Sequence, residues 1–355
     1  MSFLKPKKVL YHPDRMKEWM KTGDTSAPIT VKIDLTNVCN HNCPGCIDAD
    51  LIANDNNQLS LDLIKELLED MQQIGVKGIN YTGGGEPTAH KDFAEIIRYT
   101  AKLGLEIGLI CNGSLFHMSR IPMEEILKHF TWVRISLDSY DNETHMRTHG
   151  SKATFQRVVD NMKDLTRIKR EQDLDVTIGA GYLTNQHEDM DRQVWRFVTL
   201  CKEAGLDYAQ LRPSFGWSGS DYTSISSEEW HEIFNDLRKY ENESFALVID
   251  EGKFEKILSN NVGRCYTTCH AQSFKSTSIT ALGGVYICCS LSGKNEGLIG
   301  NIKQMKFSEI WKGDRRRRIL KDLDVGKCPK LCVGDNLNEF LEQIKEHEPA
   351  HKNFL

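Results

Sequence analysis

The chain has 355 residues, of which 39% are hydrophobic and 8% aromatic. This composition is that of a globular protein and excludes intrinsic disorder as the main state. Lys and Arg number 45 against 50 Asp and Glu, and the net charge of -5 gives no field that would attract nucleic acid or an anionic membrane. Four consecutive arginines at 315–318 follow an aspartate and predict a solvated helix face. The partner is therefore expected to be a small molecule or a peptide.

The first residues contain no apolar stretch of signal-peptide length, and no run of ~18 apolar residues that could span a bilayer occurs in the sequence. We therefore expect a cytoplasmic protein that does not enter a membrane. Thiols stay reduced in the cytoplasm, so eleven cysteines, most of them closely spaced, indicate metal ligation rather than disulfides.

Short β-branched or apolar runs alternate with longer amphipathic stretches from about residue 30 onward. The strands are expected at 29–36, 78–83, 106–113, 132–139, 175–185 and 208–215. The helices are expected at 59–75, 91–104, 122–129, 155–171, 191–205 and 226–244. Six strand-then-helix steps predict a parallel sheet with right-handed crossovers, which is typical of a partial α/β barrel.

The fold class is thus α/β: a partial (β/α)6 barrel with a smaller, cysteine-rich α+β domain at the C-terminal end. We place a lead segment at 1–29, the barrel at 30–245 and the second domain at 246–355. Ligands of such barrels lie at the carboxyl ends of the strands, on the loops that enter the helices. Polar and cysteine-rich motifs follow the first four predicted strands, so these loops are expected to form the site.

Three cysteines, Cys39, Cys43 and Cys46, lie in the loop after the first predicted strand, in a C-x3-C-x2-C spacing. A four-iron cluster normally takes four cysteines, so three thiolates leave one iron open for a ligand that is not protein. Catalytic metal sites keep such an open position. A zinc knuckle or a set of buried thiols is the alternative.

The three-cysteine motif is followed by a Gly-Gly-Gly-Glu-Pro stretch at 83–87, after the second predicted strand. Together they resemble the radical S-adenosylmethionine (radical SAM) superfamily, over about residues 30–215. The resemblance implies that a [4Fe-4S] cluster binds SAM through its open iron and yields a 5'-deoxyadenosyl radical, which removes hydrogen from the substrate. The residue before the third cysteine is usually aromatic in this family and is Gly45 here, so the adenine needs another cover, such as the backbone near Ile47.

The resemblance also implies which residues contact SAM. Glycines let the backbone approach closely, and a carboxylate complements the SAM amino group. Polar side chains at the third and fourth strand ends would contact the ribose and the methionyl carboxylate, although each alone is equally consistent with a strand-end cap. The expected SAM-binding residues are Gly84, Gly85, Glu86, Asn112, Ser136, Asp138 and Arg212.

Each of several other polar residues near the predicted site has two possible roles. The guanidinium of Arg212 could pair with a carboxylate of SAM or substrate, or form a surface ion pair. His90, His145 and His149 lie in loops after strands, and each is either a general base or polar surface.

Six further cysteines lie in the last hundred residues, and they resemble the auxiliary-cluster modules called SPASM and Twitch. The Gly-Asn-Ile and Glu-Ile-Trp motifs at 300–302 and 309–311 stand in the order that those modules show. One auxiliary [4Fe-4S] cluster fits better than two, and a structural zinc site is the alternative. The expected ligands are Cys269, Cys288, Cys328 and Cys332.

Three cysteines outside these two sets are candidate hydrogen-atom donors, because a thiol can return a hydrogen atom to a substrate radical. They are Cys265, Cys289 and Cys111, and the alternative for each is a small buried apolar side chain. Cys201 is expected to be of the buried kind.

The resemblance to Twitch-bearing enzymes favours oxidation of a sugar or aminocyclitol alcohol, with the auxiliary cluster as electron acceptor and a flavodoxin- or ferredoxin-type reductant. The substrate classes are a sugar, an aminocyclitol, a nucleotide sugar or a short peptide. Within enzymes, the alternatives are epimerisation with a cysteine hydrogen donor and peptide maturation. Many peptide-maturing relatives carry an N-terminal peptide-binding domain, and the roughly thirty residues before the first strand are expected to be too few for it, which makes peptide maturation the weaker alternative. A non-catalytic iron-sulfur scaffold is the alternative of another class.

Overall fold

The computed structural model describes residues 5–54, 56–150, 154–184, 187–213, 225–259, 261–275 and 277–346. These residues form one ten-stranded sheet with the strand order β10-β9-β8-β1-β2-β3-β4-β5-β6-β7. The strands are β1 (Thr30–Ile33), β2 (Gly78–Tyr81), β3 (Glu106–Cys111), β4 (Trp132–Ser136), β5 (Thr177–Thr184), β6 (Tyr208–Pro213), β7 (Ala246–Ile249), β8 (Ser278–Ile279), β9 (Gly284–Tyr286) and β10 (Leu298–Asn301).

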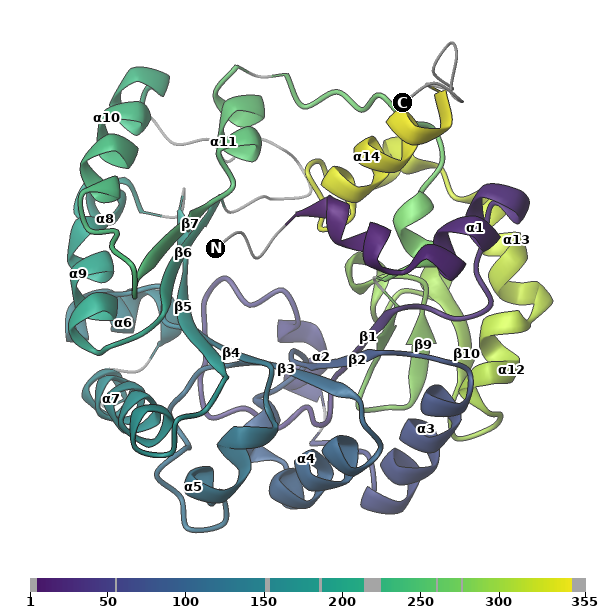
Figure 1. The fold of residues 1–355 in the computed structure, drawn as a ribbon, viewed down its shortest axis with the longest axis horizontal. Coiled ribbons are helices and arrows are strands. Elements are labelled where there is room, and N and C mark those ends of the chain that lie inside the picture. Colours follow the sequence, from purple (N-terminus) through teal and green to yellow (C-terminus); the bar gives the residue numbers. More distant parts are fainter. Residues whose placement is uncertain are drawn as a thin grey trace.

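Strands β1 to β7 are parallel and curve into an open barrel. Helices α3, α4, α5, α7, α9 and α10 lie along the outer side of this curve (Figure 1). The predicted α/β barrel is confirmed, and β7 adds a parallel strand that the sequence analysis did not predict. The helices are α1 (Pro13–Thr22), α2 (Ala49–Asn54), α3 (Leu61–Gln73), α4 (Phe93–Lys102), α5 (Met123–Ile126), α6 (Asn142–His149), α7 (Phe155–Glu171), α8 (Glu188–Asp191), α9 (Trp195–Glu203), α10 (Ser227–Arg238), α11 (Glu251–Leu258), α12 (Phe307–Lys312), α13 (Asp314–Asp322) and α14 (Asp335–Glu346).

Helix α3 shows how the amphipathic pattern produces these outer helices. The hydroxyl of Ser60 accepts a hydrogen bond from the backbone N–H of Leu63 and caps the first turn. Ile64, Leu68 and Met71 recur at helical spacing and are buried against the sheet. The helix therefore begins at its cap and is held by one apolar face.

The two faces of the curved sheet carry different side chains. Alternate residues of each strand, such as Ile33 of β1 and Leu109 of β3, belong to the hydrophobic core under the helices. The residues between them point to the inner face, because successive side chains of a strand point to opposite sides. Several of these inner residues are polar, for example Lys32, Asn80 and Arg134.

The C-terminal cysteine-rich region joins the same sheet. Strand β8 pairs with β1 in parallel, and β8, β9 and β10 form an antiparallel unit that extends the sheet beyond β1. The region that was expected to bind the auxiliary cluster therefore lies beside the strand that leads into Cys39. The division of the chain at about residue 246 stays a prediction.

A buried arginine joins the N-terminal region to α13. The guanidinium of Arg316 donates to both carboxylate oxygens of Asp24, at 2.6 and 2.8 Å, and lies 3.6 Å from the centre of the Trp311 ring. Burial would raise the pKa of Asp24, but the hydrogen bonds and charge of Arg316 hold it below its usual value. Arg315, Arg317 and Arg318 are exposed as expected, whereas Arg316 is 1% exposed, so the prediction of a solvated face is wrong at this position.

We expect Arg316→Met to destabilise the protein, because it leaves the Asp24 carboxylate partly buried without its partner. Breaking such a pair costs about 2–4 kcal/mol, and the melting temperature should fall by about 4 °C or more. Differential scanning fluorimetry measures this fall. Arg317→Met, at an exposed position of the same helix, is the control and should change the melting temperature by less than about 1 °C. Equal melting temperatures for the two variants would contradict the role of the pair.

Within the described residues, no helix combines the length and the apolar character needed to cross a bilayer.

Candidate iron-sulfur and SAM site

Cys39, Cys43 and Cys46 lie together in the loop that joins β1 to α2. The backbone N–H of Cys46 donates to the carbonyl of Cys43 at 3.2 Å, so the second and third cysteines share one turn. Burial and the neighbouring thiols raise the pKa of Cys43 to about 12, and burial is also the main cause that raises the pKa of Cys39 to about 11. Thiols gathered in this way need a cation to hold them as thiolates, which is what the irons of a cluster supply. The three-thiol donor set therefore fits the expected cluster.

The cysteine loop is fixed by the loop that follows β2. The N–H of Gly85 donates to the carbonyl of Thr36 at 2.7 Å, and the N–H of Glu86 donates to the carbonyl of Val38 at 2.9 Å. A Cβ atom on Gly85 would lie 2.2 Å from the Val38 carbonyl oxygen. Only glycine permits this approach, so the glycine motif sets the position of the backbone directly before Cys39.

Glu86 is 3% exposed and connects the ends of β2 and β3. Its Oε2 accepts from the backbone N–H of Asn112 at 2.7 Å, and its Oε1 accepts from the N–H and hydroxyl of Thr88. Burial raises the pKa of this carboxyl, and the same hydrogen bonds oppose that rise. Glu86 thus has three internal donors, and its predicted contact with the SAM amino group stays a prediction.

Asn112 extends this network to the cysteine loop. Its side-chain N–H donates to Asn40 Oδ1 at 2.9 Å, and its Oδ1 accepts from the hydroxyl of Ser114 at 2.7 Å. The Ser114 hydroxyl in turn accepts from Asn40 Nδ2 at 2.8 Å. The residue after Cys39 is therefore held to the end of β3, where Asn112 was expected.

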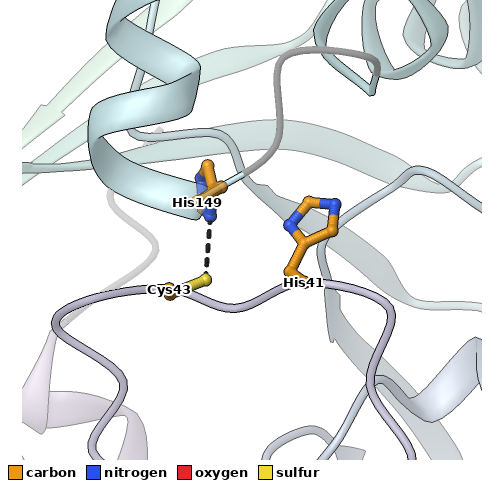
Figure 2. A group of neighbouring side chains, drawn as sticks. All are labelled: His41, Cys43 and His149. Carbon is orange, nitrogen blue, oxygen red and sulfur yellow. Dashed lines mark hydrogen bonds between the residues drawn. The ribbon is translucent and has the colours of Figure 1, made fainter.

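Two histidines flank Cys43 (Figure 2). Nδ1 of His149, at the end of α6, lies 3.2 Å from Cys43 Sγ, and its Nε2 lies 2.8 Å from the carbonyl oxygen of Leu137. Burial, followed by the charge of His149, lowers the pKa of His41 to about 4. The sequence placed His149 only in a loop, because the contact joins residues more than a hundred positions apart. The ring of His145 hydrogen-bonds to the hydroxyls of Ser139 and Thr154, and the ring of His90 hydrogen-bonds to the carbonyl of Leu59. Both histidines therefore have a structural role.

The end of β4 carries Ser136 and Asp138. Asp138 has a positive φ of 46°, a conformation that costs energy for a residue with a side chain. Its Oδ1 accepts from the backbone N–H of Leu183 at 2.6 Å, and its Oδ2 lies 3.9 Å from His149 Nε2. Asp138 thus connects β4, β5 and the histidine beside the cysteine loop. The SAM contacts proposed for both residues are not tested by this geometry.

The four cysteines expected to hold the auxiliary cluster form a second group. Burial raises the pKa of Cys288, Cys328 and Cys332, and the nearby Cys269 thiol raises each of them further. Asn338 of α14 donates to Cys269 Sγ at 3.5 Å and accepts from the N–H of Ala271. A set of four thiols fits a closed four-iron cluster. The choice of these four as its ligands stays a prediction.

Arg264 organises the loop that carries the last two cysteines. Its guanidinium donates to the carbonyls of Val325, at 2.6 Å, and Cys328, at 3.3 Å, and to Asp335 of α14, at 3.3 Å. Asp335 is 2% exposed and also accepts from the hydroxyl of Tyr266. The chain before Cys269 is thereby held to the chain around Cys328 and Cys332.

The three candidate hydrogen donors lie in different surroundings. Cys265 is exposed, and Cys111 is 3% exposed within the hydrophobic core, as is Cys201 at 0%. Cys289 lies within electrostatic reach of Lys32 on the inner face of β1 and of Lys275. Cys111 is likewise within electrostatic reach of the inner-face residue Arg134, so both Cys289 and Cys111 neighbour inner polar residues.

The inner face also holds polar residues that the sequence analysis did not identify. Lys32 Nζ lies 3.4 Å from Asp34 Oδ1, and Asp34 is 0% exposed. Neither carboxylate oxygen of Asp34, nor Oδ1 of Asn80, has a hydrogen-bond partner within the described residues. The alternation of Lys32 and Asp34 with apolar neighbours was the available signal, because inward charges in a parallel strand are rare without a role.

Two protein-family models match the parts of the chain that carry the two cysteine groups. The model of the radical SAM superfamily matches residues 33–207, and the model of an iron-sulfur cluster-binding domain (SPASM) matches residues 269–334. The chain belongs to the radical SAM superfamily and carries a C-terminal SPASM-type domain. These domains imply a SAM-binding [4Fe-4S] cluster, an auxiliary cluster and SAM as cofactors, as the sequence predicted.

Individual relatives differ in their reactions. The AdoMet-dependent heme synthase of Methanosarcina barkeri is 25% identical over 336 residues, which cover 87% of this chain and 91% of that protein. The mycofactocin maturase MftC of Mycolicibacterium smegmatis is 28% identical over 329 residues, covering 88% and 78%. The PqqA peptide cyclase of Rhodopseudomonas palustris is 30% identical over 155 residues, but these span only 39% of that protein and 43% of this chain.

Solved structures show the same fold. SuiB of Streptococcus suis, bound to its precursor peptide SuiA, superimposes with a TM-score of 0.66 and 17% identity, covering 95% of this chain and 76% of that one. The structure titled anSMEcpe with bound AdoMet gives a TM-score of 0.57 and 18% identity, covering 90% and 95%. At these identities the likeness shows the fold alone.

Gly85→Ala should disrupt the site, because its Cβ would overlap the backbone before Cys39. We expect the variant to bind SAM at least about tenfold more weakly, as a loss of about 1.4 kcal/mol or more produces. Equilibrium dialysis of SAM against the anaerobically reconstituted protein measures this. Gly252→Ala is the control, because its Cβ would meet only Asp250 Oδ1 at 4.0 Å, and it should bind SAM normally. Normal SAM binding by Gly85→Ala would contradict the tight approach.

Proposed function

We propose that this protein is a radical SAM oxidoreductase that removes hydrogen from a polar substrate held against the inner face of the sheet. Cys39, Cys43 and Cys46 would hold the SAM-binding cluster, and the four C-terminal cysteines would hold the auxiliary cluster. The bound cofactors supply the 5'-deoxyadenosyl radical and an acceptor for the second electron. The chain itself binds and orients the substrate and keeps both clusters on one sheet.

The polar inner face is the observation that carries this proposal. Buried polar atoms without partners are costly, so they are expected to meet a ligand. Within the described residues, such atoms on this face or at its edge are Asp34 Oδ2, Asn80 Oδ1, Arg134 Nε and Arg212 Nε. A carbohydrate or another polyfunctional metabolite offers the hydrogen-bonding groups that such a face needs, and an apolar substrate does not. Oxidation of a sugar or aminocyclitol alcohol is one reaction of this type.

The position of the C-terminal lobe favours an oxidative outcome over a redox-neutral one. Strand β8 lies directly beside β1, whose carboxyl end leads to Cys39. Cys289, next to the predicted ligand Cys288, is within electrostatic reach of the inner-face residue Lys32. A cluster held there is adjacent to the substrate face and is suited to accept an electron, since burial and hydrogen bonds set its potential.

Peptide maturation is the second candidate. It is favoured by the relatives named as a mycofactocin maturase and a PqqA peptide cyclase, the second of which acts on a peptide by its name. A peptide side chain could reach the same inner face. Epimerisation stays an alternative, with Cys289 and Cys111 as the candidate thiols that neighbour inner polar residues. A flavodoxin- or ferredoxin-type reductant and a cytoplasmic location stay predictions.

Iron analysis tests the assignment of the two clusters. After anaerobic reconstitution, the parent protein should hold about eight irons per chain, and replacement of Cys39, Cys43 and Cys46 by Ala should leave about four. The triple variant should also fail to produce 5'-deoxyadenosine from SAM under reduction. About four irons in the parent, with zinc in the C-terminal lobe, would remove the electron acceptor and contradict the oxidative reaction.

The converse variant separates the two sites. Replacing Cys328 and Cys332 by Ala should also leave about four irons, because two of four expected ligands are lost. SAM binding should persist, since the remaining cluster is the one with an open iron. Iron analysis and equilibrium dialysis measure the two effects. Loss of all iron, or of SAM binding in a protein that is still folded, would contradict the separate roles of the cysteine groups.

A further inference from the structure

Two arginines meet on the inner face of the sheet, around Gly181 of β5. Arg134 comes from β4, the neighbour of β5 on one side, and Arg212 comes from β6, its neighbour on the other. A Cβ atom on Gly181 would lie 3.6 Å from Cδ of Arg134 and 3.6 Å from Nη2 of Arg212. The side chains of Arg134 and Arg212 therefore border the same point of the inner face, one from each side, at van der Waals distance from it.

Neither arginine is neutralised within the described part of the chain. Arg134 Nη1 donates to the neutral amide of Gln210 at 2.9 Å, and Nε of each arginine is buried without an acceptor. Asp138 is the carboxylate near both, but its oxygens face the N–H of Leu183 and the ring of His149. Burial, followed by the charge of Arg212, lowers the pKa of Arg134 to about 9. Two adjacent, partly buried cations thus share one carboxylate, Asp138, which has contacts with other groups of its own.

Two other cations in the described residues that are largely withdrawn from solvent have carboxylate partners. Arg316 has a carboxylate on two of its nitrogens, and Lys32 has Asp34 at 3.4 Å. Burying an unpaired charge costs several kcal/mol of folding free energy. Two adjacent charges without partners are therefore expected where a bound ligand of opposite charge offsets that cost. Guanidinium groups offer several N–H donors in a planar fork that matches a carboxylate. The missing partner is therefore an anion of that shape.

We propose that Arg134 and Arg212 together bind a carboxylate group of the substrate, on the inner face between β4 and β6. The proposal rests on the proposed function and deepens it, because it specifies that the substrate is an acid. The hydrogen to be removed would then lie on the side of the substrate that faces the cysteine loop.

SAM also has a carboxylate, and the sequence analysis expected Arg212 to bind SAM, so the position of the two arginines has to distinguish SAM from substrate as the source of the carboxylate. The cysteine loop and its supports, Glu86 and Asn112, follow β1, β2 and β3. Arg134 lies on β4, directly beside β3, whereas Arg212 lies on β6, three strands or about 14 Å from β3 for a strand spacing of about 4.8 Å. The SAM carboxylate is expected at the open iron, which already supplies a positive charge. Of the described inner-face cations, Lys32 already has Asp34 at 3.4 Å, which leaves the arginine pair for a substrate carboxylate.

Acetate serves as the probe, because the substrate is not identified. The anaerobically reconstituted protein is melted in increasing acetate, with chloride replaced so that ionic strength is constant. The melting temperature should rise by about 2 °C or more at saturation, since a bound ligand stabilises the folded state.

Arg134→Met and Arg212→Met should lose this rise. Without acetate they should melt no lower than the parent, because an uncompensated buried charge has been removed. Arg167→Met, at a partly exposed ion-paired position of α7, is the control and should keep the rise.

Three results would overturn the proposal. The first is a melting temperature of the parent that acetate does not change. The second is a rise with acetate in Arg134→Met and Arg212→Met that equals the rise in the parent. The third is a rise in the parent with inorganic phosphate but not with acetate. SAM dialysis separates the sources: the two variants should bind SAM within about twofold of the parent, and a loss of about tenfold or more would assign the arginines to SAM instead. Failure of the parent to cleave SAM would contradict the proposed function and leave the acetate result to decide the arginine site separately.

Discussion

The close approach of two loops, at Gly85 and Val38, is the constraint on which the rest of the site depends. The backbone bonds from Gly85 and Glu86 fix the chain before Cys39, and the side chains of Asn40 and Asn112 fix the chain after it. A loop held in this way favours one shared cluster for the three thiols, because less of the free energy of metal binding is spent on ordering the ligands. The carboxyl ends of β1, β2 and β3 therefore act as one rigid support.

The continuous sheet carries this support to the C-terminal lobe and to the substrate face. Because β8 pairs with β1, the second cysteine group is positioned by the same hydrogen-bond ladder that positions the first. On the other side, the ladder through β4, β5 and β6 brings Arg134 and Arg212 together across a glycine. The two cysteine groups and the polar inner face are thus parts of one framework, and the absence of a side chain at Gly85 provides the space that the first cysteine loop needs.

The sequence predicted the parallel barrel and the cysteine groups because these depend on local periodicity and spacing. Helix α3 and the strands before Cys39 and Glu86 are examples, since their patterns need no distant information. The sequence could not show that His149 contacts Cys43, that Arg316 is buried against Asp24, or that Arg134 meets Arg212. Each of these contacts joins segments that are far apart in the chain, and a polar residue in a strand or helix has no local signal that separates a buried partner from a solvated one.

The central claim is that the cluster at Cys39, Cys43 and Cys46 has one iron open for SAM. Electron-nuclear double resonance on the reduced protein, with SAM labelled isotopically at its amino nitrogen, tests this most directly. The account predicts a nitrogen coupling that appears with labelled SAM and is absent from the triple alanine variant. A spectrum that SAM leaves unchanged, in a protein shown to contain the cluster, would contradict it.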